Sequence, residues 1–440
     1  MKKFFYKSSV LAALFGSVLL TSCDPEIDAP AASSGQADFA KYVAVGNSLT
    51  AGYADGGLYR SGQLNSYPAI LAQQFALAGG GEFTQPLFTP EQENGSGYLR
   101  LAGFDATGAP QLEQVKDKLA VRGMGADGKT PLYTEYPDEV NNLGVPGIKM
   151  VDVTTPGYGL NNPVGFNPYY ERLIGNELLP TSGLMPYVNK VATTNPTFFT
   201  MWLGNNDVLG FATSGGLAPI SDATRFQNNL DAIVSTLTAN SETKGAIINI
   251  PDVTGVPFFT AKATAGIIAS ATAANTQLYI TESAGTVRPA TAADYVLLTS
   301  TVGTPEEVGP MTIPHGFSPY NPLTNGEVLD AAEVAAVKAA TTDFNSKLSA
   351  AAQAKGLAYV DMNAFFNSIQ MKEGLPTLNL NAVNYSPAFI SGNLFSLDGV
   401  HLTPRGYAIV ANEIIRSINT KYGSSVPTVD ETKYKTVALP

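Results

Sequence analysis

YVAVGNSLTAG, residues 42–52, joins an apolar run to a run of small and polar residues at a single glycine. The apolar part, Tyr42–Val45, has no charged residue, which is typical of a strand buried on both faces of a parallel sheet. Gly46 permits a tight turn and the close approach of another group. The stretch therefore predicts a buried strand, followed by a loop that holds Ser48 at the carboxyl end of that strand.

Apolar runs of the same kind recur along the chain and alternate with helical patterns. The further strands are expected at about Val140–Val145, Thr197–Leu203, Ala246–Ile250 and Ala358–Asp361. Helices are expected over Tyr67–Ala78, Asp222–Thr238, about Leu329–Ala354, and after Thr403-Pro404. Strands that alternate with helices predict a three-layer α/β/α sandwich around a five-stranded parallel, flavodoxin-like sheet. In such sheets, sites lie at the carboxyl ends of the strands.

Two stretches do not fit this core, at about residues 80–138 and 256–326. Long segments of this kind are either functional or small subdomains. Two interpretations stay open, insertions over the active-site face or surface decoration, and we expect the first within a domain spanning 40–422. Residues 423–440 have the composition of a loose C-terminal tail.

The N-terminus has the pattern of a targeting signal. Three lysines precede the apolar stretch Val10–Leu20, which is too short to span a bilayer as a stable helix. The stretch ends in Leu20-Thr-Ser-Cys23, which resembles the lipobox of bacterial lipoproteins. The resemblance implies a signal peptide over 1–22, lipid on Cys23 and a flexible tether over 23–39. We therefore expect an exported protein, anchored by lipid to a membrane of a bacterial cell envelope, with the outer membrane or cell surface favoured.

Composition excludes several classes of function. The 440-residue chain has a formal net charge of −11, and it shows no basic cluster beyond the N-terminus, so nucleic-acid binding is not expected. Hydrophobic residues make up 44%, enough for a large core. Two histidines and one cysteine cannot build an ordinary zinc site or an intramolecular disulfide, and we expect no metal.

The two histidines narrow the search for a general base to His315 and His401. His401 follows Asp398 by three residues, on the loop before the last expected helix. An aspartate at this spacing can bond one ring nitrogen, which leaves the other nitrogen for a nucleophile. Taken alone, the segment is equally compatible with a solvated loop histidine beside an unrelated acid.

Two other strand ends carry hydrogen-bond donors. Gly204-Asn205-Asn206-Asp207 follows one expected strand, and Asn141–Gly147 follows another. Side-chain amides and exposed backbone N–H groups are the donors that an oxyanion requires. Ordinary turn chemistry explains each segment equally well when it is considered separately.

These motifs together resemble the sequence blocks of the SGNH, or GDSL-type, hydrolase family, in the same chain order. The matching positions are Gly46–Leu49, Gly147, Gly204–Asp207, and Asp398 with His401. The resemblance covers residues of about 40–255 and 340–420. Asn47 departs from the family, which has aspartate there. Gly144 remains an alternative to Gly147, because the spacing from Ser48 is longer than the family's.

The resemblance implies a serine esterase that acts through a covalent acyl-enzyme and needs no cofactor. Ser48 would be the nucleophile, His401 its base and Asp398 the third member of the triad. The N–H groups of Ser48 and Gly147 and the Asn206 side chain would form the oxyanion hole. Lipid or simple acyl esters are slightly favoured as substrates. A carbohydrate O-deacetylase and a non-catalytic, ligand-binding lipoprotein remain alternatives.

Overall fold

The computed structural model describes residues 31–106, 108–136, 138–174, 184–372 and 375–440. The chain divides into two units, Met1–Ala31 and Ala32–Pro440, and the second unit contains the sheet and the candidate site. Cys23 and the expected signal peptide lie outside the described residues. No helix in the described ranges is long and apolar enough to cross a membrane.

A five-stranded, all-parallel sheet forms the centre of the fold, as predicted. Its strands are β1 (Tyr42–Gly46), β6 (Asn142–Gly144), β7 (Phe198–Trp202), β8 (Lys244–Ile248) and β15 (Ala358–Val360). They lie in the order β15-β8-β7-β1-β6, which is the flavodoxin-like order. Gly46 is in register with both Gly144 and Trp202. The loops that follow these three strands therefore start side by side at one edge of the sheet.

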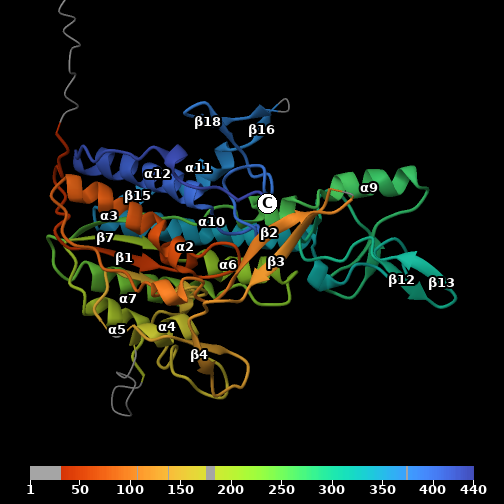
Figure 1. Ribbon diagram of the computed structural model, residues 1–440, viewed down its shortest axis with the longest axis horizontal. Helices are drawn as coiled ribbons and strands as arrows, with labels where there is room; N and C mark the ends of the chain where they lie inside the picture. Colours follow the sequence, from red (N-terminus) through yellow and green to blue (C-terminus); the bar gives the residue numbers. More distant parts are fainter. Residues whose placement is uncertain (1–30, 107, 137, 175–183, 373–374) are drawn as a thin grey trace, which may run out of the picture. The chain divides into compact units, whose positions relative to one another are not determined.

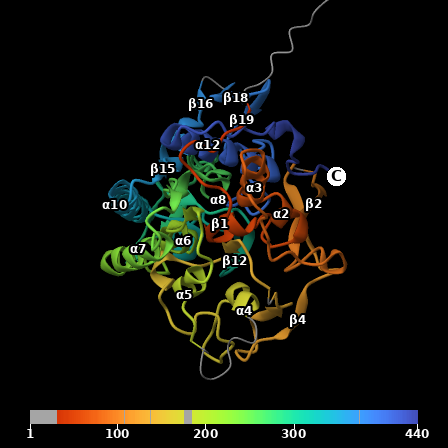
Figure 2. The same cartoon turned by 90° about the vertical axis from the view of Figure 1, so that its left-hand side faces the viewer.

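Helices cover both faces of the sheet and complete the three layers (Figures 1 and 2). α3 (Tyr67–Leu77) and α12 (Pro404–Tyr422) pack in the apolar cluster that includes Ala44. α7 (Ala223–Leu237) and α10 (Ala331–Ala354) pack in the cluster that includes Val43. Neighbouring residues of β1 thus point to opposite helix layers, which explains why the whole strand is apolar.

Helix starts follow the capping residues that the sequence contains. Ser66, Asp222, Asp330 and Thr403 each accept a hydrogen bond from a backbone N–H in the first turn of α3, α7, α10 and α12. Shorter helices outside the second insertion are α1 (Ser48–Ala51), α2 (Arg60–Leu64), α4 (Pro168–Ile174), α5 (Tyr187–Ala192), α6 (Asn205–Thr213) and α11 (Met362–Ser368). Short 3-10 turns lie at Pro90–Gln92, Met150–Asp152 and Val253–Gly255.

The two expected insertions consist of hairpins and short helices. The first holds β2 (Tyr98–Phe104) paired with β3 (Pro110–Val115), and β4 (Val121–Met124) paired with β5 (Pro131–Tyr133). The second holds α8 (Pro257–Thr260), α9 (Thr264–Ala273), β9 (Tyr279–Thr281) with β10 (Val287–Pro289), and β12 (Pro305–Val308) with β13 (Met311–Pro314). β11 (Tyr295–Val296) pairs with β14 (Val328–Leu329) after the turn Asn325–Glu327. The second insertion has a small apolar cluster of its own.

A third excursion from the core, residues 369–400, was not expected from the sequence. It contains β16 (Met371–Lys372), β17 (Leu375–Pro376), β18 (Leu378–Leu380) and β19 (Val383–Tyr385). β16 pairs with β17, and β18 pairs with β19. The excursion follows α11 and ends in the loop that carries Asp398 and His401, so it leads directly into the site.

Both ends of the second unit are more ordered than the sequence suggests. Residues 423–440, expected as a loose tail, lie along α12, where Asn412 exchanges two hydrogen bonds with the backbone of Val429. The tail also contains the turn Glu431–Lys433. The last part of the expected tether is fixed as well, because Phe39 is buried and stacks on Phe75 at 4.1 Å between ring centroids. Apolar residues inside these polar segments supply the contacts.

Candidate active site

Ser48 is the first residue of α1 and stands directly beyond the end of β1. Asn47 caps this short helix, because its side-chain oxygen accepts from the Leu49 N–H at 3.0 Å. A Cβ on Gly46 would lie 2.0 Å from the Thr50 hydroxyl oxygen and 2.8 Å from the Trp202 carbonyl oxygen. Only glycine fits at this position, and the turn that presents Ser48 depends on it.

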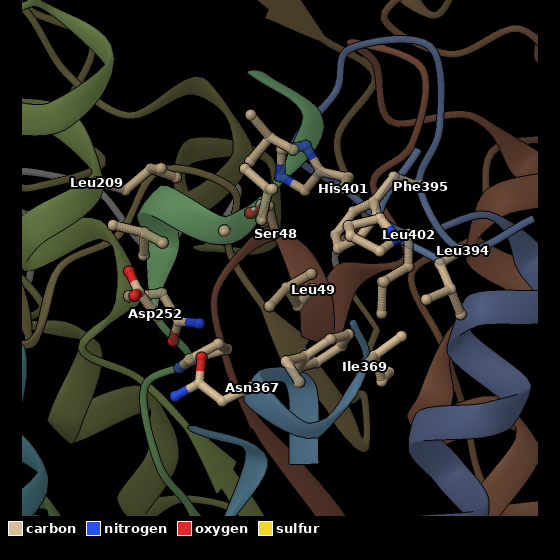
Figure 3. Close-up of a pocket in the computed structure, with 18 of the residues that line it drawn as sticks. Ser48, Leu49, Leu209, Asp252, Asn367, Ile369, Leu394, Phe395, His401 and Leu402 are labelled. Atoms are coloured by element: carbon tan, nitrogen blue, oxygen red, sulfur yellow. Dashed lines mark hydrogen bonds between the residues drawn. The ribbon is translucent and has the colours of Figure 1, made fainter. Parts of the chain in front are cut away.

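His401 lies beside Ser48, although 353 residues separate them in the chain. The His401 Nε2 atom is 2.8 Å from the Ser48 hydroxyl oxygen, and His401 Nδ1 is 2.8 Å from a carboxylate oxygen of Asp398. Figure 3 shows the two side chains meeting at the edge of a cavity. The structure thus places the three expected residues in one hydrogen-bonded chain.

The Asp398 carboxylate is held by several donors. Its Oδ1 atom accepts from the N–H groups of Val400 and His401, and its Oδ2 atom accepts from the Gly56 N–H at 2.9 Å. Burial alone would raise the pKa of Asp398, but the charge and hydrogen bonds of His401 and the backbone donors hold it well below its usual range. An ionised Asp398 favours a proton on Nδ1 of His401, which leaves Nε2 free to accept the Ser48 proton.

Asn206 lines the same cavity as Ser48 and His401. Its side-chain amide donates one hydrogen bond, to the Ile148 carbonyl oxygen at 2.9 Å. An amide nitrogen has a second hydrogen to offer. Asn205 is also buried at the cavity, so both asparagines of the Gly204–Asp207 segment reach it.

The two candidate glycines after β6 differ in their N–H groups. The Gly144 N–H donates to the Asn142 side chain at 2.9 Å, and a Cβ there would lie 2.3 Å from the Ala51 nitrogen. Gly144 is therefore a packing position. The Gly147 N–H has no acceptor among the described residues, and the backbone there has a φ of +85°. Gly147 is not among the residues that line the cavity, but it precedes Ile148, which bonds Asn206.

Asp207 connects the two donor-bearing segments and was not singled out from the sequence. Its buried carboxylate accepts from the N–H groups of Met150, at 2.6 Å, and Val151, at 3.3 Å. Burial raises the pKa of Asp207 to about 6, although the hydrogen bonds oppose the shift. Asp207 therefore fixes the turn after Gly147 against the start of α6. In the sequence, only its place beside Asn206 in the Gly204–Asp207 motif could have indicated this role.

An apolar cavity of about 340 Å³ opens from Ser48. Its apolar lining is formed by Leu49, Leu209, Val253, Val256, Phe366, Ile369, Pro387, Leu394, Phe395 and Leu402. Most of these residues belong to α6, α11 and the third excursion (Figure 3). No residue of the first insertion lines the cavity, and the second insertion contributes only its first residue, Val256. The expectation that both insertions cover the site is therefore wrong for this cavity.

The sequence also matches the model of a known family. The model described as GDSL-like Lipase/Acylhydrolase matches residues 42–414, which span all of the motifs above. The chain belongs to the GDSL-like lipase/acylhydrolase family. The family supports a hydrolase of the serine esterase type.

Two solved structures are similar to this chain at low identity. A putative GDSL-like lipase from Parabacteroides merdae is 11% identical, with a TM-score of 0.34 over 88% of this chain and 99% of that one. An extracellular lipase from Streptomyces rimosus is 13% identical, with a TM-score of 0.29 over 86% of this chain and 98% of that one. No curated protein sequence matches this chain.

In this GDSL-like hydrolase, an aromatic side chain that sequence reasoning missed packs on the histidine. The Tyr53 ring lies against the His401 ring, with 4.6 Å between centroids. The Tyr53 hydroxyl donates to the Gly56 carbonyl oxygen at 2.7 Å, and the Tyr407 hydroxyl donates to the Tyr53 carbonyl oxygen at 2.6 Å. The ring thus limits the orientations of the imidazole. No period or spacing in the sequence marks this contact.

The second histidine lies in the second insertion and serves a different role. His315 Nδ1 is 3.0 Å from Glu306, and its Nε2 is 2.8 Å from Glu327. Burial lowers the pKa of His315, but the two glutamates outweigh burial and raise it. Nowhere in the described chain do three or more His, Cys, Asp or Glu side chains form a group that could hold a metal ion.

Proposed function

We propose that this chain hydrolyses carboxylic esters through a covalent acyl-enzyme, with Ser48 as nucleophile. One observation carries the proposal: the Ser48 hydroxyl, the two nitrogens of His401 and the Asp398 carboxylate form a chain with both contacts at 2.8 Å. This is the geometry by which a base takes a proton from a nucleophile while an acid orients the base.

The proposed reaction has two halves. His401 takes the Ser48 proton as the hydroxyl oxygen attacks the ester carbonyl, and then gives that proton to the leaving alcohol. Water, activated by His401, next attacks the acyl-enzyme and releases the carboxylic acid. The Asn206 amide and the N–H groups of Gly147 and Ser48 are the proposed donors to the oxyanion. Gly147 supports this assignment because its N–H is not used within the described chain.

The lining of the cavity favours an acyl group of several carbons. Burial of apolar surface contributes about 0.8 kcal/mol per methylene, so an aliphatic chain gains affinity from such walls. A carbohydrate deacetylase needs room only for an acetyl group and polar side chains for the sugar. We therefore infer that the substrates are lipid or simple acyl esters. Acetylated glycans are the alternative substrates that the experiment below compares with them.

We also propose that the protein is exported and held at a bacterial envelope membrane by lipid on Cys23. The support is the short apolar stretch that ends at Leu20-Thr-Ser-Cys23. The proposal places the ester substrate at or near a membrane surface, which agrees with an apolar acyl group.

The decisive experiment is labelling with a fluorophosphonate probe, combined with hydrolysis of p-nitrophenyl esters. The wild-type protein should be labelled and active, and Ser48→Ala should lose both properties with an unchanged melting temperature. The matched control is Ser270→Ala, because Ser270 is an exposed serine on α9. A protein that binds esters without labelling would be a non-catalytic binder. Activity on acetylated glycans above that on p-nitrophenyl esters would favour the deacetylase.

A further inference from the structure

A tight turn after α1 holds the loop of the catalytic acid. Asp55 lies in this turn with a φ of +52°, a conformation that residues other than glycine, asparagine and aspartate rarely adopt. Its Oδ1 atom accepts from the Leu397 N–H at 2.9 Å, and its own N–H donates to the Ser396 hydroxyl at 2.9 Å. The next residue, Gly56, donates its N–H to Asp398. Three bonds thus join the turn to residues 396–398.

The Asp55 carboxylate is fully engaged in this arrangement. Its Oδ2 atom accepts from the Tyr59 hydroxyl at 2.7 Å. The Ser396 hydroxyl, which accepts from Asp55, lies 3.2 Å from Asp398 and donates to it. Asp55 and Asp398 are therefore connected through one serine. Two carboxylates this close repel each other, so the protein retains the pair at an energetic cost.

The first insertion packs on the other side of the same turn. The Leu99 N–H, from β2, donates to the Asp55 carbonyl oxygen at 2.7 Å. A Cβ on Gly57 would lie 1.7 Å from the Gly97 carbonyl oxygen, so the two backbones touch. The Ser96 N–H donates to the Leu58 carbonyl oxygen at 2.9 Å. The turn therefore lies between the first insertion and the loop of the catalytic acid.

We propose that Asp55 is a positioning residue that transmits the packing of the first insertion to Asp398. The inference rests on the proposed function, because positioning matters only if Asp398 orients a catalytic base. Asp55 is not among the residues that line the cavity. Its loss would free the Leu397 N–H and loosen the Ser396–Asp398 segment. The imidazole would then lose its fixed orientation, and kcat would fall more than KM changes.

Two substitutions separate the possible causes of such a loss. Asp55→Gly removes the carboxylate while glycine accepts the positive φ without strain. Asp55→Asn keeps an oxygen for the Leu397 N–H and also suits the positive φ. It removes the charge and puts an NH2 group in place of the oxygen that accepts from the Tyr59 hydroxyl. Asp127→Asn is the matched control, since Asp127 accepts from Thr130 in an exposed turn of the first insertion.

The experiment measures kcat and KM for p-nitrophenyl esters, over the pH range in which each variant stays folded. We expect Asp55→Gly to lower kcat roughly 10- to 100-fold with KM within about threefold. Asp55→Asn should lose less activity, and the acidic limb of its kcat/KM profile should move to lower pH, because a negative charge close to the site is removed. Asp127→Asn should match the wild type.

A kcat for Asp55→Gly within twofold of the wild type would overturn the proposal. If this variant does not fold, Asp55→Asn decides: a profile that coincides with that of the wild type, with equal kcat, overturns it. Fluorophosphonate labelling of the wild-type protein separates this inference from the proposed function. An unlabelled wild type refutes the esterase, whereas a labelled wild type with unaffected Asp55 variants refutes only the role of Asp55.

Discussion

The apolar cavity predicts how activity depends on the acyl chain. Its volume is about 340 Å³, and an engineered cavity of about 150 Å³ holds one benzene molecule. By proportion, the cavity admits roughly a dozen carbon-sized atoms. Since the ester group and the open end take part of this space, we expect a best chain of about eight carbons.

The size of the preference follows from the burial of methylenes. Each buried methylene contributes about 0.8 kcal/mol, which multiplies kcat/KM by about four. Going from an acetyl to an octanoyl ester adds about six methylenes, so full burial gives an increase of roughly 3,000-fold. Half burial gives roughly 60-fold. We expect kcat/KM to rise within this range and then level off or fall for longer chains.

Two opposite changes in the wall test whether this cavity is responsible. Leu209 lines the cavity from α6, and Phe366 lines it from α11. Leu209→Trp should fill space and lower octanoyl hydrolysis about tenfold, the value of one or two methylenes, with acetyl hydrolysis unchanged. Phe366→Ala should move the best chain length upward. Leu77→Trp, at the exposed end of α3, is the control.

The assay is kcat/KM for a series of p-nitrophenyl esters from acetate to laurate, below the critical micelle concentration. A flat series, or one that is highest at acetate, would refute the acyl role of the cavity. The same conclusion would follow if Leu209→Trp lowered activity on all chain lengths equally.

Other parts of the molecule give three further expectations. Asn206→Ala should lower kcat by roughly two to three orders of magnitude with less effect on KM, and Asn205→Ala serves as the comparison. His315→Gln should leave kcat unchanged but destabilise the protein by about 1–3 kcal/mol at low pH. The pKa of His315 is raised, so its ion pairs with the glutamates stabilise the protein fully below the ordinary histidine pKa of about 6.5. This stabilisation is lost as the pH rises through the raised pKa, so the difference in melting temperature between the wild type and the variant should close. Cys23→Ser should move the protein from the membrane fraction to the soluble fraction, and a protein that stays attached without lipid would contradict the anchor.

The core of the fold was predictable because a strand that is buried on both faces of the sheet consists mainly of apolar residues. All five strands were expected within a few residues, since most of them coincide with runs of mainly apolar residues. β6 carries the weakest pattern, because it contains Asn142. The four long helices of the core were equally visible, because capping residues such as Thr403 and Asp330 precede them. The shorter helices were not expected. The positions of Ser48 and His401 followed from their places beside these elements.

The third excursion could not be predicted for a physical reason. Its strands are two or three residues long, and polar residues interrupt its apolar positions. Contacts with distant parts of the chain stabilise such strands, so local propensity does not mark them. The choice between Gly144 and Gly147 has the same origin. It depends on whether the Gly144 N–H already donates to the Asn142 side chain, and only the folded chain determines this.

The precision of the site depends on the same residues that make the sheet recognisable. Ser48 and Asn206 approach one cavity because β1 and β7 pair in one register, with Gly46 opposite Trp202. A slip of one residue would displace the two strand ends by about 3.3 Å, more than a hydrogen bond tolerates. It would also turn the side chains of β1 to the wrong helix layers. Val43 and Ala44, buried in opposite layers, therefore fix the register and with it the distance between Ser48 and Asn206.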